Sequence, residues 1–556
     1  MSTRNPSASG ASSTATPTIA HEPEHPKVEM AEEIVVDWDG PDDPENPRNW
    51  SRNKKWAATL VVSSFTLISP VSSSMIAPAT AEVADEFSVT NQVLIAMMTS
   101  IFVLAYAIGP LFLGPLSEIY GRNKVLQLAN LWYLIWNLVC GFAQTAPQLL
   151  VFRFLAGFGG SAPLAVAGAV LGDIWAPEER GQALAIYSLA PLLGPVVGPV
   201  CGAFIAQRST WRWVFWSTSI FTVGVQILGV FYIRESYAPL LLERRAARLR
   251  KSLAAAGAEG GHVPKVKARF TDENHTWKTV LHIALSRPFI IFYHEPIIQL
   301  LGVYMAFIYG VFYIFLVSMP PMFQNVYHES VEIAGLHYLA LGIGVSAASQ
   351  TNARAMDWMY RTLKERRGGV GEPEYRLPSM YPGTIFLPVG LLMTGWGVQA
   401  GVHWIVPDIG IALVGAGIIL NFQSIQIYIV DAFALYAASG ASFFPFCFKL
   451  PQLKFEINPN PTALACVGCL RSLCGFAFPL FAQSMYDKLG YGKGDTILAV
   501  LAVVIGCPAP VLFWRYGKRI RGRSKFAKQP DSLSDPKPEL AEGRSTGDDG
   551  RRQTKE

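Results

Sequence analysis

The chain alternates between long apolar segments and short polar ones. Twelve apolar segments can be delimited, most of them close to the roughly 20 residues that cross a bilayer as a helix. In chain order they cover residues 56–78, 91–113, 125–143, 148–171, 182–206, 213–233, 288–317, 333–351, 380–399, 405–430, 463–486 and 495–514. The pattern predicts an all-α integral membrane protein.

Polar segments divide the twelve predicted helices into two sets of six. The segment 234–287, rich in Arg and Lys, separates 56–233 from 288–514 and is predicted to be a cytoplasmic loop. A polar tail, 1–55, lacks the apolar core of a signal peptide, and a basic tail, 515–556, follows the last helix. We expect both tails to be disordered. Two bundles joined by a long loop predict parallel halves around a central cavity.

Charge supports this prediction and orients the helices. Of the 556 residues 51% are hydrophobic and 16% are charged, against about 25% charged in soluble domains. The net charge of +5 comes from basic residues gathered in particular loops, which argues against nucleic acid as a partner. The alternate loops, 79–90, 144–147, 318–332 and 400–404, contain no Lys or Arg. Both termini are therefore predicted to be cytoplasmic.

No cofactor or metal site is predicted. Cys466 and Cys469 have a C-x-x-C spacing, but no second pair exists and the surroundings are an apolar helix. The sequence contains no G-x-x-x-x-G-K-[ST] phosphate loop, so we expect neither an ATPase nor ATP as the direct energy source.

The sequence GPLSEIYGRNK, residues 114–124, predicts a charged turn at the membrane surface between the second and third helices. A plain hairpin would need only positive charge, whereas this turn has Gly114 and Gly121 seven residues apart, Glu118 between them and Arg122 directly after. It resembles the loop between helices two and three of the major facilitator superfamily, whose usual acid is Asp. The resemblance implies the major facilitator fold, with these residues as a cytoplasmic latch that holds the halves in one state.

Arg153 is predicted to lie within the fourth helix. A guanidinium inside a membrane is costly, so it should face the cavity and contact an acid or a carbonyl. The alternative is an Arg that reaches the interface from a helix end. In the family, an Arg followed four residues later by Gly, here Gly157, is associated with proton coupling.

The fifth helix carries a stripe of small residues. Gly194, Gly198 and Gly202 recur every four residues, with Pro195 and Pro199 between them. Such a stripe lets another helix approach closely, and we expect a pairing of the fifth and eighth helices between the halves. The stripe resembles the antiporter motif of drug exporters, although Pro199 stands where that motif has Gly. Plain helix packing is the alternative.

The seventh helix is predicted to contain His294 and Glu295 ahead of a proline kink. Glu295 is the candidate to carry the transported proton, with His294 as its neighbour in proton coupling or as a substrate contact, and a structural Glu at the interface is the alternative. Candidate cavity residues are aromatic or polar positions on three predicted helices: Tyr304, Tyr309, Tyr313, Asn421, Gln423, Gln426 and Arg471. A mostly aromatic cavity suits amphipathic or cationic compounds.

The segment 441–461 departs from the family pattern. If it spanned the membrane, the last two helices would invert and the basic tail would emerge outside, against the charge bias. We therefore interpret it as an intracellular, interfacial or re-entrant insert. A retained intron is the hypothesis for its origin, and sequencing the spliced transcript tests it.

Residues 37–517, apart from this insert, resemble the fungal drug:proton antiporter family with twelve helices. The resemblance implies a monomeric multidrug or polyamine exporter at the plasma membrane, whose partners are a small organic substrate, protons and the bilayer. Three alternatives stay open: an uptake porter for a nutrient such as a sugar, a membrane sensor that does not transport, and an inactive product of the insert.

Overall fold

The computed structural model describes residues 33–176, 179–257, 265–269, 277–369, 371–439 and 460–523. All but the last two residues of the predicted insert at 441–461 lie outside the described residues. The described helices and strands belong to two compact units, Met1–Asp37 with Leu242–Thr271, and Trp38–Leu241 with Asp272–Glu556.

The smaller unit contains a two-stranded parallel sheet. Strand β1 (Glu33–Val36) pairs with β2 (Lys265–Ala268), and Arg269 forms an ion pair with Asp37. All but the first turn of helix α9 (Ala238–Gly257) belongs to the same unit. The sequence predicted a disordered tail up to residue 55, but backbone hydrogen bonds to the central loop order residues 33–36 as a strand.

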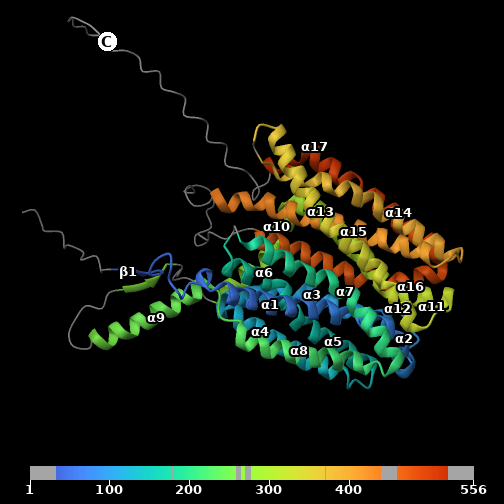
Figure 1. Ribbon diagram of the computed structural model, residues 1–556, viewed down its shortest axis with the longest axis horizontal. Coiled ribbons are helices and arrows are strands. Elements are labelled where there is room, and N and C mark those ends of the chain that lie inside the picture. Colours follow the sequence, from blue (N-terminus) through green and yellow to red (C-terminus); the bar gives the residue numbers. More distant parts are fainter. Residues whose placement is uncertain are drawn as a thin grey trace, which may run out of the picture. The chain divides into compact units, whose positions relative to one another are not determined.

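The first half of the larger unit is helical (Figure 1). Its elements are η1 (Pro47–Asn49), α1 (Arg52–Ser74), η2 (Ala77–Ala79), α2 (Thr80–Glu86), α3 (Gln92–Tyr120), α4 (Arg122–Cys140), α5 (Ala146–Gly160), α6 (Ala162–Ile174), α7 (Arg180–Arg208) and α8 (Arg212–Tyr232). Three prolines lie inside α7, which membrane helices tolerate because neighbouring groups satisfy the freed carbonyls.

The second half repeats this helical architecture. Its elements are α10 (Trp277–His294), α11 (Pro296–Tyr327), α12 (Val331–Leu336), α13 (Tyr338–Arg366), η3 (Pro373–Ser379), α14 (Met380–Gln399), α15 (Ile405–Ser439), α16 (Asn460–Gly506) and α17 (Pro508–Arg523). Gly490, at φ 78°, divides α16 into two helices.

Nine segments among the described residues are long and apolar enough to cross a membrane. They cover ten of the twelve predicted helices, because the segment Cys466–Gly522 contains both of the last two. The predicted helices 125–143 and 380–399 correspond to α4 and α14, which are not among these nine segments.

Two local predictions differ from the structure. The predicted turn at 114–124 is one residue long, because α3 continues to Tyr120 and α4 begins at Arg122. The predicted seventh helix is broken rather than kinked, because α10 ends at His294 and α11 begins at Pro296. Pro296 has no N–H to continue the helix and disfavours helical geometry at Glu295, which is extended.

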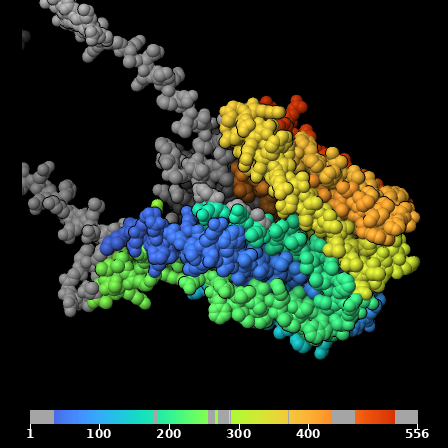
Figure 2. Space-filling model, viewed as in Figure 1, coloured from blue at the N-terminus to red at the C-terminus, as the bar shows by residue number. Residues whose placement is uncertain are grey.

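The two halves meet where α7 packs against α12 and α13, and α3 of the first half also packs against α10 and α16 of the second. Gly335 lies against Ala203, and Gly342 lies against Val196. Figure 2 shows the yellow helices of the second half touching this end of α7, while the two groups diverge toward the other end. We call the end with α12 the far end, and the end with Arg122 the near end.

Candidate functional site

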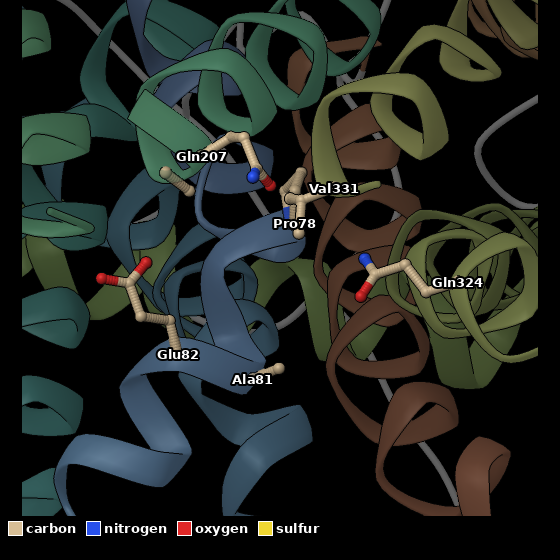
Figure 3. A pocket seen from close by; sticks show the side chains of 7 residues that line it. Pro78, Ala81, Glu82, Gln207, Gln324 and Val331 are labelled. Carbon is tan, nitrogen blue, oxygen red and sulfur yellow. The ribbon is translucent and has the colours of Figure 1, made fainter. Parts of the chain in front are cut away.

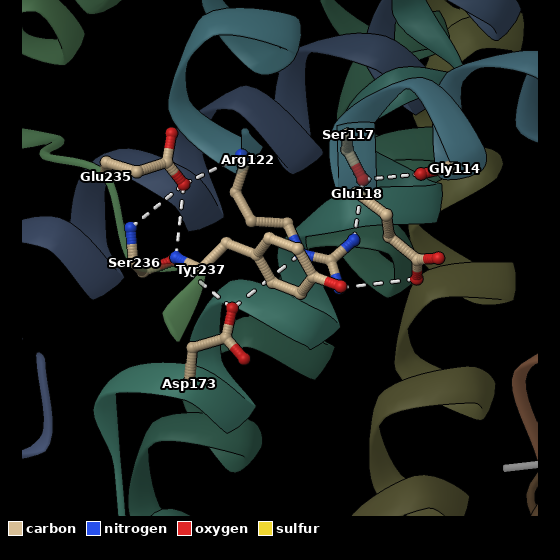
Figure 4. A network of polar contacts seen from close by, with 8 residues as sticks. All are labelled: Gly114, Ser117, Glu118, Arg122, Asp173, Glu235, Ser236 and Tyr237. Carbon is tan, nitrogen blue, oxygen red and sulfur yellow. Dashed lines mark hydrogen bonds and ion pairs between the residues drawn. The ribbon is translucent and has the colours of Figure 1, made fainter. Parts of the chain in front are cut away.

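Arg122 is the centre of a polar network at the near end (Figure 4). Its buried side chain donates from Nη1 to Ser117 Oγ at 2.6 Å. Nη2 lies 3.5 Å from Glu118 Oε1, and Nε lies 3.7 Å from Asp173 Oδ2. The backbone N–H of Arg122 donates to Glu235 Oε1 at 2.9 Å. This Arg122 network therefore joins α3, α4, α6 and the segment after α8.

The two glycines of the motif differ in what the geometry requires. Gly121 has φ 103°, and a Cβ there would overlap the carboxylate of Glu235, so only glycine fits. A Cβ at Gly114 would meet no atom within 4 Å. The Gly114 carbonyl accepts a hydrogen bond from Ser117 Oγ, a contact that any residue could make at that position.

The segment after α8 closes the network. Glu235 Oε1 also accepts from the backbone N–H groups of Ser236 and Tyr237, and Ser236 Oγ donates to Asp173 at 3.3 Å. The Arg122 guanidinium lies 4.8 Å from the ring centroid of Tyr237. Burial, together with the negative charge of Glu118, raises the pKa of Tyr237 to about 12. Sequence reasoning missed Asp173, although an acid directly after the fourth apolar segment was a usable signal.

The second half contains a similar network around Arg376 in η3. Its Nη1 donates to Asp357 in α13, at 2.9 Å, and its Nε donates to Asp431 in α15, at 3.0 Å. The guanidinium lies 4.4 Å from the ring centroid of Tyr360. Burial opposes the charged form, but the two carboxylates raise the pKa of Arg376 above its ordinary value. Sequence reasoning did not identify this Arg376 network.

The described partners of Arg122 come from the first half and the segment directly after α8, and those of Arg376 come from the second half. The family resemblance implied a latch between the halves. Among the described contacts, each network instead fastens the helix ends of its own half.

Arg153 lies in α5 and is 1% exposed. Its Nη2 donates to the carbonyl oxygens of Ser73 at 3.0 Å and Thr99 at 3.3 Å. The guanidinium lies within 5.6 Å of the ring centroids of Phe102 and Phe215. The carbonyl partners agree with one of the predicted partner types. Such burial does not fit the alternative, in which the side chain reaches the interface.

Hydroxyl groups lie close to Arg153 and connect the halves. Ser69 Oγ is 2.6 Å from Tyr106 Oη, and Ser73 Oγ is 3.4 Å from Tyr313 Oη of α11. Ser73 thus contacts Arg153 through its carbonyl and the second half through its hydroxyl. This arrangement places a buried charge beside an interface between the halves.

Arg471 lies among the aromatic candidates. Its guanidinium is 4.7 Å from the ring centroid of Tyr309 and 5.3 Å from that of Phe422. Tyr309 in turn lies 5.1 Å from Tyr313, between ring centroids. Tyr304 lies elsewhere, with its hydroxyl against Gly506 in the second part of α16. The structure therefore brings together Tyr309, Tyr313 and Arg471, but not Tyr304.

The polar candidates of α15 point in different directions. Asn421 is buried against Gly383 of α14 and donates to the Gly417 carbonyl of its own helix. Gln423 donates to Ser349 of α13 at 2.6 Å. Gln426 is exposed. Asn421 and Gln423 thus join neighbouring helices within the second half.

The proton candidates at the seventh helix do not lie beside Arg153. Glu295 is fully buried at the junction of α10 and α11. His294 is exposed, and its Nδ1 lies 2.8 Å from the Ile290 carbonyl. The two neighbouring residues therefore lie in different environments, because Glu295 is buried and His294 is exposed.

The small-residue stripe of α7 faces α1. Cβ atoms at Gly194, Gly198 and Gly202 would overlap Pro70, Val71 and Met75. The prolines Pro195 and Pro199 are buried beside this contact. The predicted eighth helix, which the structure divides into α12 and α13, does pair with α7 between the halves, but through Gly335 of α12 and Gly342 of α13 rather than through this stripe.

A pocket of about 240 Å³ lies between the halves at the far end (Figure 3). It is lined by Pro78, Ala81, Glu82, Ala206, Gln207, Gln324 and Val331. Beside it, Arg208 Nε at the end of α7 donates to Glu332 Oε2 in α12 at 3.1 Å. This ion pair joins the two halves, and no sequence signal had singled it out.

Among the described residues no group of three His, Cys, Asp or Glu side chains could hold a metal ion. Cys466 and Cys469 are free thiols, and Cys466 is buried.

A family model described as Major Facilitator Superfamily matches residues 62–455. The chain is 45% identical to the protein named "Efflux pump vrtL" from Penicillium aethiopicum, over 89% of this chain and 91% of that protein. It is 39% identical to "MFS-type transporter penM" from Penicillium rubens, over 88% and 90%. The fold is similar to that of the xylose transporter XylE from E. coli, with a TM-score of 0.58 at 14% identity, over 84% of this chain and 98% of that one. The predicted all-α transporter fold is confirmed, and the relatives are transporters rather than enzymes.

Proposed function

The chain belongs to the major facilitator superfamily, and from that premise we propose that it exports small organic compounds in exchange for protons. The membrane is the plasma membrane, and the near end faces the cytoplasm. Export is supported by relatives that are named efflux pumps and that match this chain over most of its length. The orientation is supported by the basic residues that gather at the near end.

The buried charge of Arg153 is the main observation that supports proton exchange. In the described part of the chain its hydrogen bonds go to two backbone carbonyls and no carboxylate forms an ion pair with it. Holding a guanidinium inside a membrane in this way is costly, so such residues mark ion pathways. Through Ser73 the charge is coupled to the contact between the halves, and a change in its surroundings would alter that contact.

Arg471 narrows the chemical class of substrate that we propose. Its guanidinium covers one face each of Tyr309 and Phe422, the ring faces that an organic cation would otherwise use. A cationic substrate bound here would be repelled by the positive charge of Arg471. We therefore propose neutral or anionic aromatic compounds as the preferred substrates, in place of the cationic ones favoured by the sequence.

The test measures retention of labelled compounds in pump-deficient yeast that produces the protein at its surface. The panel contains neutral, anionic and cationic aromatic compounds, each with and without a protonophore. Lower retention that the protonophore abolishes is the expected result, and unchanged retention of every compound contradicts the proposal.

A matched pair of variants tests the coupling residue. Arg153→Gln should lose protonophore-sensitive export, because it removes the buried charge. Arg354→Gln removes an exposed arginine from α13 and should export normally. Equal export by both variants contradicts the role of Arg153.

A further inference from the structure

A histidine at the far end is held between two carboxylates. His337 Nδ1 lies 2.7 Å from Asp408 Oδ1, and His337 Nε2 lies 2.8 Å from Glu329 Oε2. All three side chains are largely buried, with exposed fractions of 7% for His337, 14% for Asp408 and 16% for Glu329. The imidazole also stacks on Phe323, with ring centroids 3.6 Å apart and planes 2° from parallel.

This geometry depends on a proton. An ionised carboxylate only accepts hydrogen bonds, so two such partners require both ring nitrogens to donate. A neutral imidazole donates from one nitrogen and presents a lone pair at the other. With both acids ionised, loss of one proton therefore turns one of the two contacts into a repulsion between a lone pair and a carboxylate.

The three residues hold both ends of α12. Glu329 immediately precedes Ser330, the N-cap of this six-residue helix, and His337 is its C-cap. Asp408 fastens this pair to the start of α15. Because α12 is short, its position depends on what holds its two ends.

Helix α12, together with α13, packs against α7 of the first half. Glu332 pairs with Arg208, and Gly335 lies directly against Ala203. The position of α12 thus determines one of the contacts that close the far end between the halves.

We propose that Glu329, His337 and Asp408 form a proton-operated clamp that positions α12 and keeps the far end closed. Low pH at the far end protonates His337 and closes this end. Removal of the His337 proton loosens the contact of α12 with α7. His337 acts as a positioning residue. The inference rests on the proposed function only for the statement that the far end faces outward.

Other titratable and charged groups surround the clamp. Tyr327, at the end of α11, donates to the Val402 carbonyl and lies close to both acids. Glu332 in α12 is already paired with Arg208. His403 is exposed and neighbours Trp404, whose ring lies 5.9 Å from that of His337. Among these groups only His337 bridges two carboxylates.

The experiment measures the distance between spin labels on α7 and α12. Cysteines replace the exposed residues Gln207 and Ile333 in a parent whose exposed Cys201 is replaced by Ser, and signal from labels on the remaining thiols is subtracted with the parent. The full chain is labelled once, placed in nanodiscs and measured from about pH 5 to about pH 9, which covers the usual range of histidine titration. One short distance is expected at acid pH, with a longer distance gaining population as pH rises.

Three variants make the test specific. His337→Gln carries both of its N–H donors on one nitrogen, so it cannot donate at both ring-nitrogen positions and should show the longer distance at every pH. Asp408→Asn should show the short distance at every pH, because its amide can donate to a neutral imidazole and accept from a charged one; Glu329→Gln is expected to behave in the same way. His403→Gln should titrate like the parent.

A parent whose distances do not change with pH, or a His337→Gln variant that titrates like the parent, overturns the clamp. The measurement does not require transport. A protein that shows the expected titration but exports no compound would therefore keep the clamp and overturn the proposed function.

Discussion

Arg122 illustrates how much a single buried charge organises. Its guanidinium contacts Ser117, Glu118 and Asp173, while its backbone N–H binds Glu235. Replacing it with alanine leaves Asp173 without its arginine partner and releases the ends of α3 and α6 from each other. Removing one partner of a buried ion pair typically costs about 3–5 kcal/mol.

We therefore expect Arg122→Ala to lower the rate of export at least about tenfold, which corresponds to about 1.4 kcal/mol in the balance between conformations. Export rate and surface abundance are measured together. Lys124→Ala removes a neighbouring basic residue and is the matched control. Normal export by Arg122→Ala at normal abundance would remove the network from the mechanism.

At the near end of the second half, a buried ion pair joins η3 to α17. Arg521 Nη2 donates to Glu374 Oε2 at 2.9 Å, with both side chains 5% exposed. Arg521→Gln should destabilise the fold by about 3–5 kcal/mol, because it leaves a buried carboxylate unpaired. The neighbouring pair of Lys518 and Glu372 is exposed on the lysine side, so Lys518→Gln should change stability by less than about 1 kcal/mol.

The same variant gives stability a dependence on pH. Burial raises the pKa of Glu374 even though Arg521 opposes the rise, so loss of Arg521 raises the pKa further. The folded variant then holds a proton that the unfolded chain has already lost. Its unfolding temperature should fall as pH rises from the ordinary pKa of Glu through the raised one. Thermal melts across this range check the sign, and a melting temperature that rises with pH would contradict it.

The contact between α7 and α13 is a place where closure of the far end can be tested by substitution. A Cβ at Gly342 would lie 2.6 Å from Val196, so Gly342→Val should push the helices apart at a cost of about 1–3 kcal/mol. We expect weaker closure of the far end and slower export. Adding Val196→Ala restores space and should restore both, as spin-label distances and export rates would show. A double variant no better than the single one would place the cause elsewhere.

The elements also show what the sequence could reveal. The helices that cross the membrane were predictable because each must present a long apolar run to lipid. The break at Glu295 was visible in Pro296, yet only the structure distinguishes a break from a kink. The neighbour of the Gly194 stripe was not predictable, because it depends on how α7 is rotated in the bundle. For the same reason the sequence located Arg122 but not its partners Asp173 and Glu235.

At the scale of the whole molecule, the two halves fasten their near ends in the same manner. Arg122 joins the end of α3 to the end of α6, and Arg376 joins α13 to α15. Each arginine lies between two carboxylates and over a tyrosine ring. A transporter whose halves rock against each other needs each half to move as one body.

Arg376→Ala should therefore impair export as Arg122→Ala does, because rigidity of both halves is required for a single rocking motion. If the networks serve one motion, the double variant should export no worse than the slower single variant. Independent roles would instead multiply the two losses. Arg361→Ala, which removes an exposed arginine near the end of α13, is the matched control. Export rates of the two single variants, the double variant and the control, normalised to surface abundance, decide whether the two networks contribute jointly or separately. Normal export by Arg376→Ala would show that only the first half needs its network.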